Sequence, residues 1–397
     1  MKRIGVRVGR WLAVGSMVAV ALPLLLPPVL AAQGTLKVGM ILAMTGPGAF
    51  YGKVMSRGAQ LAVDQINKAG GIGGYKLELL VEDHKSGDAD AAVSAARKLM
   101  EVDKVPVILT SYSAPTLAVQ PVAVEKKVLL LNGGAVGSQL VGKPTLYNTR
   151  MLANQSAPFV VQWAVERLNA KRVATLFWND AAGQGMNGGL KEACKKVGCQ
   201  IVAEEAHDIG AKSYSPQLAR LRAARPDVLT LGSWGDDVGY ILNQARAYGL
   251  TVPVVGVDWT PNAQKIGGKA MEGYTISVDR FDPGGADPTT KAFVEAYRAA
   301  HGEAAELYAA NYYEHARFIL SVLIKRVADR GADPTKPGVL LSEMERALGE
   351  KLKFQSVYGG EMQISPDGTV VKPLGVYHVK DGELRLIARI VGGKIQQ

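Results

Sequence analysis

The sequence predicts an α/β protein built from two doubly wound, parallel-sheet lobes. From Leu36 onward, short apolar runs alternate with amphipathic segments of helical length, which is the pattern of repeated βαβ units. The alternation pauses around residues 147–154 and then starts again, which indicates two similar halves. With 397 residues, 48% of them hydrophobic, the chain can bury a large core, and its 45 glycines suit many tight turns.

The individual elements follow from this alternation. In the first half we expect strands at residues 36–43, 76–82, 105–110 and 128–131, and helices at residues 53–69, 89–101 and 114–125. In the second half we expect helices at residues 156–169, 186–197, 216–224 and 238–248, and strands at residues 172–178, 200–204, 228–231, 254–257 and 274–279. Helical stretches follow at residues 289–301, 306–330 and 337–349. An Asp-Gly turn at residues 381–382 predicts a hairpin of strands 374–380 and 383–390.

The first 31 residues have the order of a secretory signal peptide. Four Lys and Arg residues within the first ten precede an apolar stretch at residues 11–26, and residues 29–31 supply a cleavage site. The alternative is a membrane anchor, since residues 11–32 are about long enough to span a bilayer. Pro23, Pro27 and Pro28 favour cleavage. We therefore expect an exported protein.

Charge and cysteine content narrow the class further. Removing four positive charges with residues 1–31 lowers the formal net charge from +10 to +6, and the remaining basic residues form no block, so we expect no nucleic-acid partner. Cys194 and Cys199 flank Gly198, which would end the helix at residues 186–197. In an exported protein they form either a local disulfide or two buried free thiols.

Sequence motifs of catalysis are absent or weak. The five histidines form no His-x-x-His pair, and neither a Gly-x-Ser-x-Gly motif nor a phosphate-binding loop occurs. Residues 183–188 match Gly-x-Gly-x-x-Gly, but four residues separate the preceding strand from Gly183, whereas a dinucleotide fingerprint needs the turn at the strand end. We interpret these residues as a glycine-rich loop and helix start beside a cleft. We expect no catalytic residue, metal or cofactor.

Two sets of residues fall where strands should end at a cleft. Ser113 is a suitable N-cap for a helix with Pro115 in its first turn, and such a helix start binds carboxylates. The alternative is ordinary capping with nothing bound. Trp178, Trp234 and Trp259 follow strands of the second half, and Asp258 precedes the last of them. Aromatic walls with one carboxylate suit a small ligand that has an apolar or flat part.

At these residues the chain resembles the periplasmic substrate-binding proteins of branched-chain amino-acid ABC transporters, the leucine/isoleucine/valine type. The resemblance covers nearly all of the mature chain. It is carried by KVGMILAMTGP at residues 37–47, GAQLAVDQIN at 58–67, SYS at 111–113, ARPD at 224–227 and QARAYG at 244–249.

The resemblance implies the type I periplasmic-binding-protein fold, with a three-strand hinge between two lobes. The expected division is a signal peptide at 1–31, an N-terminal lobe at 32–151 and 280–357, and a C-terminal lobe at 152–279 and 358–397. The implied partners are a small-molecule ligand and a membrane ABC permease, the implied location is the periplasm, and we expect a monomer.

The resemblance also implies a ligand site. The loop containing Tyr112 and Ser113, and the loop Gly134, Ala135 and Val136, would bind the α-carboxylate and α-amino end of an amino acid. Asp258 would meet the ammonium group, Trp234 would supply an aromatic contact, and Tyr51 would lie near the cleft mouth.

Two positions depart from the amino-acid pattern. Val136 stands where the family usually has a hydroxyl, and Ala182 stands where an aromatic residue often precedes the glycine. A lost hydroxyl removes a polar contact, and a lost ring enlarges the pocket. We therefore expect an exported solute-binding protein whose ligand is an amino acid, an aromatic or other organic acid, or an amide. The alternatives are a ligand-sensing receptor subunit of the same fold and a dinucleotide-binding oxidoreductase.

Overall fold

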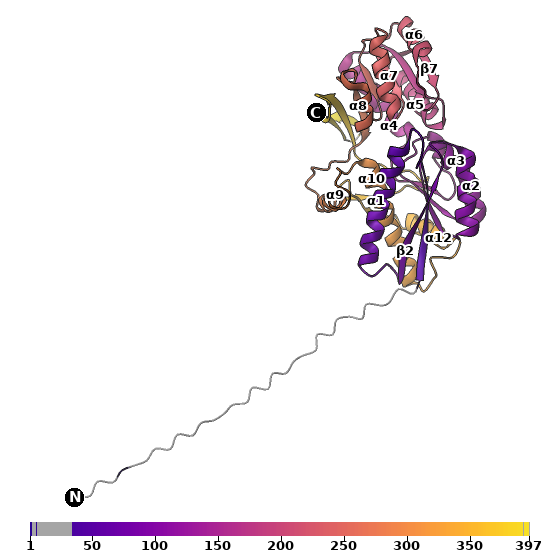
Figure 1. The fold of residues 1–397 in the computed structure, drawn as a ribbon, viewed down its shortest axis with the longest axis vertical. Coiled ribbons are helices and arrows are strands. Elements are labelled where there is room, and N and C mark those ends of the chain that lie inside the picture. Colours follow the sequence, from indigo (N-terminus) through magenta and orange to yellow (C-terminus); the bar gives the residue numbers. More distant parts are fainter. Residues whose placement is uncertain (2–4, 6–33, 392, 397) are drawn as a thin grey trace.

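The computed structural model describes residues 1, 5, 34–391 and 393–396, and Figure 1 shows them as two α/β lobes. Apart from Met1 and Gly5, the predicted signal peptide lies outside the described residues. Within the described part of the chain, no helix is both long enough and apolar enough to cross a membrane.

The first lobe is built on a five-stranded parallel sheet with the order β2-β1-β3-β4-β5. Its strands are β1 (Gly34–Leu42), β2 (Tyr75–Asp83), β3 (Val107–Thr110), β4 (Leu129–Asn132) and β5 (Leu146–Asn148). The connecting helices are α1 (Ala49–Lys68), α2 (Ala89–Arg97), which continues into the π-helical segment Lys98–Val102, and α3 (Ser113–Lys126). Successive side chains of β1 face opposite sides of the sheet, so Met40 packs with α1 while Ile41 packs with α2 and α3.

The second lobe is built on an eight-stranded sheet, β15-β14-β13-β10-β9-β8-β6-β7. Five of its strands are parallel: β6 (Arg172–Trp178), β7 (Gln200–His207), β8 (Val228–Gly232), β9 (Val254–Gly256) and β10 (Thr275–Asp279). The antiparallel strands β13 (Leu374–Lys380) and β14 (Glu383–Val391) form the predicted hairpin, and β15 (Lys394–Gln396) extends it. The helices are α4 (Ala153–Leu168), α5 (Ala181–Val197), α6 (Ser215–Ala223), α7 (Asp236–Ala247) and α8 (Pro261–Gly267).

The chain passes between the lobes three times, after β5, after β10 and before β13. The segment between the last two crossings contains α9 (Pro288–His301), α10 (Leu307–Glu314), α11 (Ser321–Asp329), α12 (Val339–Gly349), β11 (Phe354–Gln355) and β12 (Glu361–Met362). The N–H group of Asn148 at the end of β5 donates to the carbonyl of Gly368 at 2.8 Å. Gly368 therefore lies beside the first sheet, whereas the expected division assigned residues from 358 onward to the second lobe.

The start of α5 differs from the sequence-based expectation. Asp180 accepts a hydrogen bond from the N–H of Gly183 at 2.9 Å and caps the helix, which begins at Ala181 and not at Met186. Of the interpretation of residues 183–188 as a glycine-rich loop and helix start, the loop part is therefore wrong, since all six residues lie within the first half of α5. A Cβ atom on Gly183 would stand 2.0 Å from the carbonyl oxygen of Trp178, so this glycine allows α5 to pack closely against β6.

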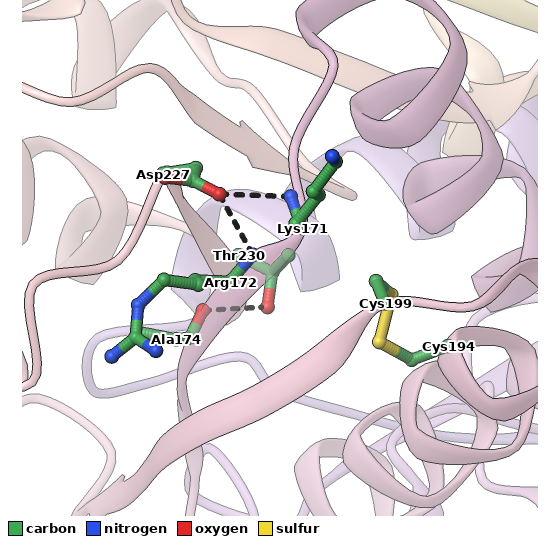
Figure 2. The surroundings of a disulfide bond; sticks show 7 residues. All are labelled: Lys171, Arg172, Ala174, Cys194, Cys199, Asp227 and Thr230. Carbon is green, nitrogen blue, oxygen red and sulfur yellow. Dashed lines mark hydrogen bonds between the residues drawn. A yellow bond between two sulfur atoms is a disulfide. The ribbon is translucent and has the colours of Figure 1, made fainter.

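Cys194 and Cys199 form a disulfide that joins the end of α5 to the start of β7 (Figure 2). Gly198 ends α5 with a φ of +77°, and the N–H of Cys199 donates to the carbonyl of Cys194 at 3.0 Å. In the same region Asp227 accepts hydrogen bonds from the N–H groups of Lys171 and Arg172, both at 2.8 Å. These contacts fix the ends of neighbouring strands in the second lobe.

Candidate functional site

A cavity lies between the two lobes, where the strands of both sheets end. Seven of the eight ligand-binding residues expected from the sequence line it: Tyr51, Tyr112, Ser113, Gly134, Ala135, Val136 and Trp234. The other lining residues are Met55, Trp178, Asp180, Ala182 and Tyr308.

The first lobe supplies hydrogen-bond donors from the start of α3. Ser113 is the first helical residue and makes no capping bond, so the expectation that it is the N-cap is wrong. Instead, its hydroxyl oxygen accepts from the N–H groups of Val136 at 3.3 Å and Gly137 at 2.9 Å. Its own proton is thereby left to donate to a ligand. The N–H groups of the first helical residues have no acceptor within a helix, so an anion is stabilised here.

Tyr112 precedes α3 in a conformation that favours glycine, with a φ of +61°. Its hydroxyl is buried and has no hydrogen-bond partner among the described residues. Strained backbone of this kind persists where the surrounding structure fixes it, commonly at ligand sites. Tyr112 therefore brings a second hydroxyl without a partner to the lining of the cavity.

The loop Gly134 to Val136 lines the cavity, but its N–H groups already donate to other groups of the protein. Asn132 accepts hydrogen bonds from the N–H groups of Gly134 at 3.1 Å and Ala135 at 2.7 Å, and Val136 donates to Ser113. These three N–H groups are therefore engaged within the protein. The loop contributes an apolar wall, consistent with Val136 in place of a hydroxyl residue.

Aromatic rings from both lobes form the rest of the wall. The rings of Tyr112 and Trp178 stack across the interface with their centres 5.9 Å apart, and Trp234 lies 5.1 Å from Trp178. The indole N–H of Trp178 donates to Asp237 at 2.8 Å, which fixes the plane of that ring. Tyr51 and Tyr308 make an edge contact at 4.9 Å. The cavity therefore suits a ligand with a flat or apolar body.

Asp258 lies behind the tyrosines and does not line the cavity. One of its oxygens accepts from the hydroxyl of Tyr51 at 2.7 Å and from the N–H of Gly235 at 2.9 Å, and the other accepts from the hydroxyl of Tyr308 at 3.3 Å. Burial raises the pKa of Asp258, and these hydrogen bonds oppose the rise. Asp258 thus joins the lobes through two first-lobe tyrosines, and three donors already occupy the oxygens expected to meet an ammonium group.

Trp259 also departs from the expected arrangement. It lines a separate cavity with Phe50 and Pro261, so two of the three singled-out tryptophans reach the ligand cavity. Asp258 and Trp259 are adjacent in the segment before α8, and neither lines the ligand cavity. A strand end in the sequence therefore does not show that the residues after it face the cleft.

Three lining residues were not singled out from the sequence. Asp180 is the acidic residue of the lining, and burial raises the pKa of its carboxyl. Its position directly after a strand and before a helix was a usable signal. Tyr308 and Met55 lie on helices, and Tyr308 comes from α10, far along the chain, so only the folded structure brings it to the cavity. Over the residues that the structure describes, no group of three or more His, Cys, Asp and Glu is placed to hold a metal.

Comparison with known proteins places this site in a family. The periplasmic binding protein family model matches residues 35–383. The leucine-, isoleucine-, valine-, threonine- and alanine-binding protein of Pseudomonas aeruginosa is 27% identical over 311 residues, which cover 77% of this chain and 81% of the relative. The leucine-specific-binding protein of Salmonella typhimurium is 30% identical over 269 residues, 66% of this chain and 72% of the relative.

Solved structures share the fold. The solute-binding protein of an ABC transporter from Rhodopseudomonas palustris, in complex with 3,4-dihydroxybenzoic acid, is similar with a TM-score of 0.76 and 25% identity. The alignment covers 89% of this chain and 97% of that one. The match of the family model over most of the chain, together with the two-lobed fold and its cavity, shows that the chain belongs to the periplasmic binding protein family.

Proposed function

We propose that this chain captures a small organic acid with an aromatic or bulky apolar body in the cavity between its lobes. The carboxylate of the ligand lies at the start of α3, where Ser113 and Tyr112 donate to it. The body of the ligand lies against Trp178 and Trp234 of the second lobe. One observation carries the proposal: Asp258 already accepts from Tyr51, Tyr308 and Gly235 and does not line the cavity, so the site offers an anion position without its expected ammonium partner.

Ligand capture is coupled to the arrangement of the lobes. The cavity is bounded by side chains from both, and the bonds from Tyr51 and Tyr308 to Asp258 cross between them. Contacts of this kind exist together only when the lobes are closed, so a ligand that touches both lobes shifts the population towards the closed form. The closed form then docks on an ABC permease.

A second candidate ligand is an α-amino acid. The carboxylate of Asp180 lines the cavity and would meet an ammonium group there. The Salmonella relative is a leucine-specific-binding protein, which supports the same class.

The predicted signal peptide and the family membership support further proposals about the location and partners of the protein. We infer a periplasmic monomer that binds its ligand without catalysis and has no nucleic-acid partner. A sensor subunit would use the same closed form to engage a receptor. The dinucleotide-binding alternative is disfavoured, because the glycines of its motif lie inside α5 and Gly183 serves helix packing.

Intrinsic tryptophan fluorescence of the mature protein, stripped of carried-over ligand by unfolding and refolding, tests the ligand class. Trp178 and Trp234 line the cavity and report its occupancy. We expect saturable changes with benzoate or 3-phenylpropanoate and none with benzamide or benzylamine. Saturation by leucine together with silence towards every aromatic acid would overturn the proposed class in favour of an amino acid.

A further inference from the structure

A second, smaller cavity adjoins the first near the hinge. Val136 and Trp234 line both cavities, so they stand between the two spaces. A ligand whose body lies against these side chains has its far end directed at the second cavity. The polar residues that line the second cavity but not the first are Arg150, Ser156, Ser277 and Asp279, and Asp279 also lines the cavity that contains Trp259.

Three polar atoms in this cavity are buried without a hydrogen-bond partner among the described residues: Nε of Arg150, Oδ2 of Asp279 and Oγ of Ser277. The residues are only 4%, 3% and 3% exposed, respectively. Ser277 and Asp279 are two residues apart on β10, so their side chains share one face of the strand. Buried polar groups without partners are costly, so such a cluster at a cavity indicates a place for a polar ligand group.

Arg150 is held firmly in this position. One of its terminal nitrogens donates to the carbonyl of Gly134 at 3.2 Å, and its guanidinium lies 5.1 Å from the ring centre of Tyr308. Gly134 and Tyr308 both line the first cavity. Nε of Arg150 lies 3.5 Å from Oδ2 of Asp279, an ion pair too long for a good hydrogen bond. The donor and the acceptor therefore lie side by side, and each can still bond to a third group.

The chemistry of these atoms selects the group that fits. A hydroxyl has two acceptor positions and one proton, so it can accept from Nε of Arg150 and from the hydroxyl of Ser277 and donate to Oδ2 of Asp279, which satisfies all three groups. A second carboxylate would meet Arg150 but would be repelled by Asp279, and an ammonium group would be repelled by Arg150. A methyl group would leave all three atoms unpaired.

We propose that Arg150, Ser277 and Asp279 form a subsite that binds a hydroxyl group at the end of the ligand remote from its carboxylate. The inference rests on the proposed function, since it needs the carboxylate at α3 and the body of the ligand against Trp234. The ligand class is thereby narrowed to hydroxylated aromatic or apolar acids. This subsite near the hinge, away from the carboxylate, would distinguish hydroxylated acids from their parent acids.

Matched ligand pairs of two lengths test the subsite. The full mature protein is titrated calorimetrically with benzoate and 4-hydroxybenzoate, and with 3-phenylpropanoate and 3-(4-hydroxyphenyl)propanoate, with terephthalate as the dicarboxylate. In at least one pair we expect the hydroxylated acid to bind about tenfold more tightly than its parent, and terephthalate to bind more weakly than that parent.

Two serine variants locate the effect. S277A should reduce the ratio of the dissociation constants of parent and hydroxylated acid to within about twofold of one. S156A is the matched control, because Ser156 lines the same cavity but its hydroxyl already donates to the carbonyl of Leu152 at 3.3 Å. S156A should retain the wild-type ratio. Thermal unfolding of both variants checks that each is folded.

The outcomes separate the two proposals. If no acid of either pair binds while leucine does, the proposed function fails, and the subsite fails with it. If the parent acids bind and neither hydroxyl improves affinity, the subsite alone is refuted. A preference for the hydroxylated acid that S277A and S156A affect equally would also refute the assignment to Ser277.

Discussion

The two lobes share one plan and differ at the ends of their helices. The strand orders β2-β1-β3-β4-β5 and β7-β6-β8-β9-β10 are equivalent. In each lobe a strand is followed by a serine and an aromatic residue, Ser111-Tyr112 after β3 and Ser233-Trp234 after β8. Each serine hydroxyl contacts a buried histidine, His84 at 3.1 Å and His207 at 2.8 Å.

The helices that follow these residues differ in charge. The first turn of α3 begins with Ser113 and contains no acidic residue, whereas α7 begins with Asp236 and Asp237. Acidic side chains in the first turn stabilise the positive end of a helix dipole, so the dipole of α7 is already compensated and that of α3 is not. This difference supports the proposal that the first lobe holds the anionic end of the ligand and the second lobe its apolar body.

We expect the largest loss of ligand affinity from placing an acidic residue in the first turn of α3, as α7 has in its own first turn. In S113D a carboxylate occupies the helix start, so binding of an aromatic acid should weaken by at least about 100-fold. D236N is the control in the second lobe, because Asp236 bonds to Asn262 and does not line the cavity. Calorimetric titration of both variants measures the effect. Similar losses in the two variants would contradict the asymmetry between the lobes.

The second lobe is tested through its aromatic wall. W234L removes a flat ring that lines the cavity, and we expect the affinity for aromatic acids to fall by about tenfold. W259L removes a tryptophan of the other cavity and should leave affinity within about twofold of wild type. Calorimetry avoids the loss of the fluorescent reporter. An equal effect of the two substitutions would show that Trp234 does not contact the ligand.

Removing the contact between the lobes at Asp258 should reduce ligand affinity by a smaller factor. In D258A the hydroxyls of Tyr51 and Tyr308 lose their acceptor in the closed form, so every ligand should bind about fivefold more weakly. The prediction is tested by comparing an aromatic acid with leucine, or with any amine-bearing ligand that binds. A loss confined to amine-bearing ligands would instead assign Asp258 to an ammonium group.

The buried histidine that each lobe contains should affect the stability of the protein and not its affinity for the ligand. Burial lowers the pKa of His84 to about 4 and also lowers that of His207. Because the folded pKa of His84 lies below the unfolded value near 6.5, its contribution to stability is complete above that value and is lost as pH falls towards 4.

Denaturant unfolding at two pH values measures this contribution. Between pH 7 and pH 5 the free energy of unfolding should fall by about 2 kcal/mol more in wild type than in H84Q. H207Q should change the pH dependence in the same direction. An identical pH dependence in wild type and H84Q would show that His84 is not buried in its neutral form.

Most of the fold could be predicted because its signals are local. Alternating apolar runs located the parallel strands, and an Asp-Gly turn located the hairpin of β13 and β14. The start of α5 was misplaced because a glycine in a helix that packs on a strand has the same sequence signal as a glycine in a loop. Gly183 is distinguished only by its approach to the carbonyl of Trp178.

The site was predicted less completely for a physical reason. Strand ends marked Tyr112, Ser113 and Trp234, and these residues do line the cavity. Tyr308 was missed because its helix reaches the cavity only through tertiary packing. The location of Asp258 was apparent from the sequence but its bonding was not, since its partners Tyr51 and Tyr308 lie on two other elements.

A crystal structure of the protein with the tightest-binding aromatic acid tests the orientation of the ligand most directly. We expect the carboxylate to lie within hydrogen-bond distance of Ser113 at the start of α3, with the ring against Trp234. The opposite orientation, with the carboxylate at the second lobe and the ring at α3, would show that the first lobe does not hold the anionic end.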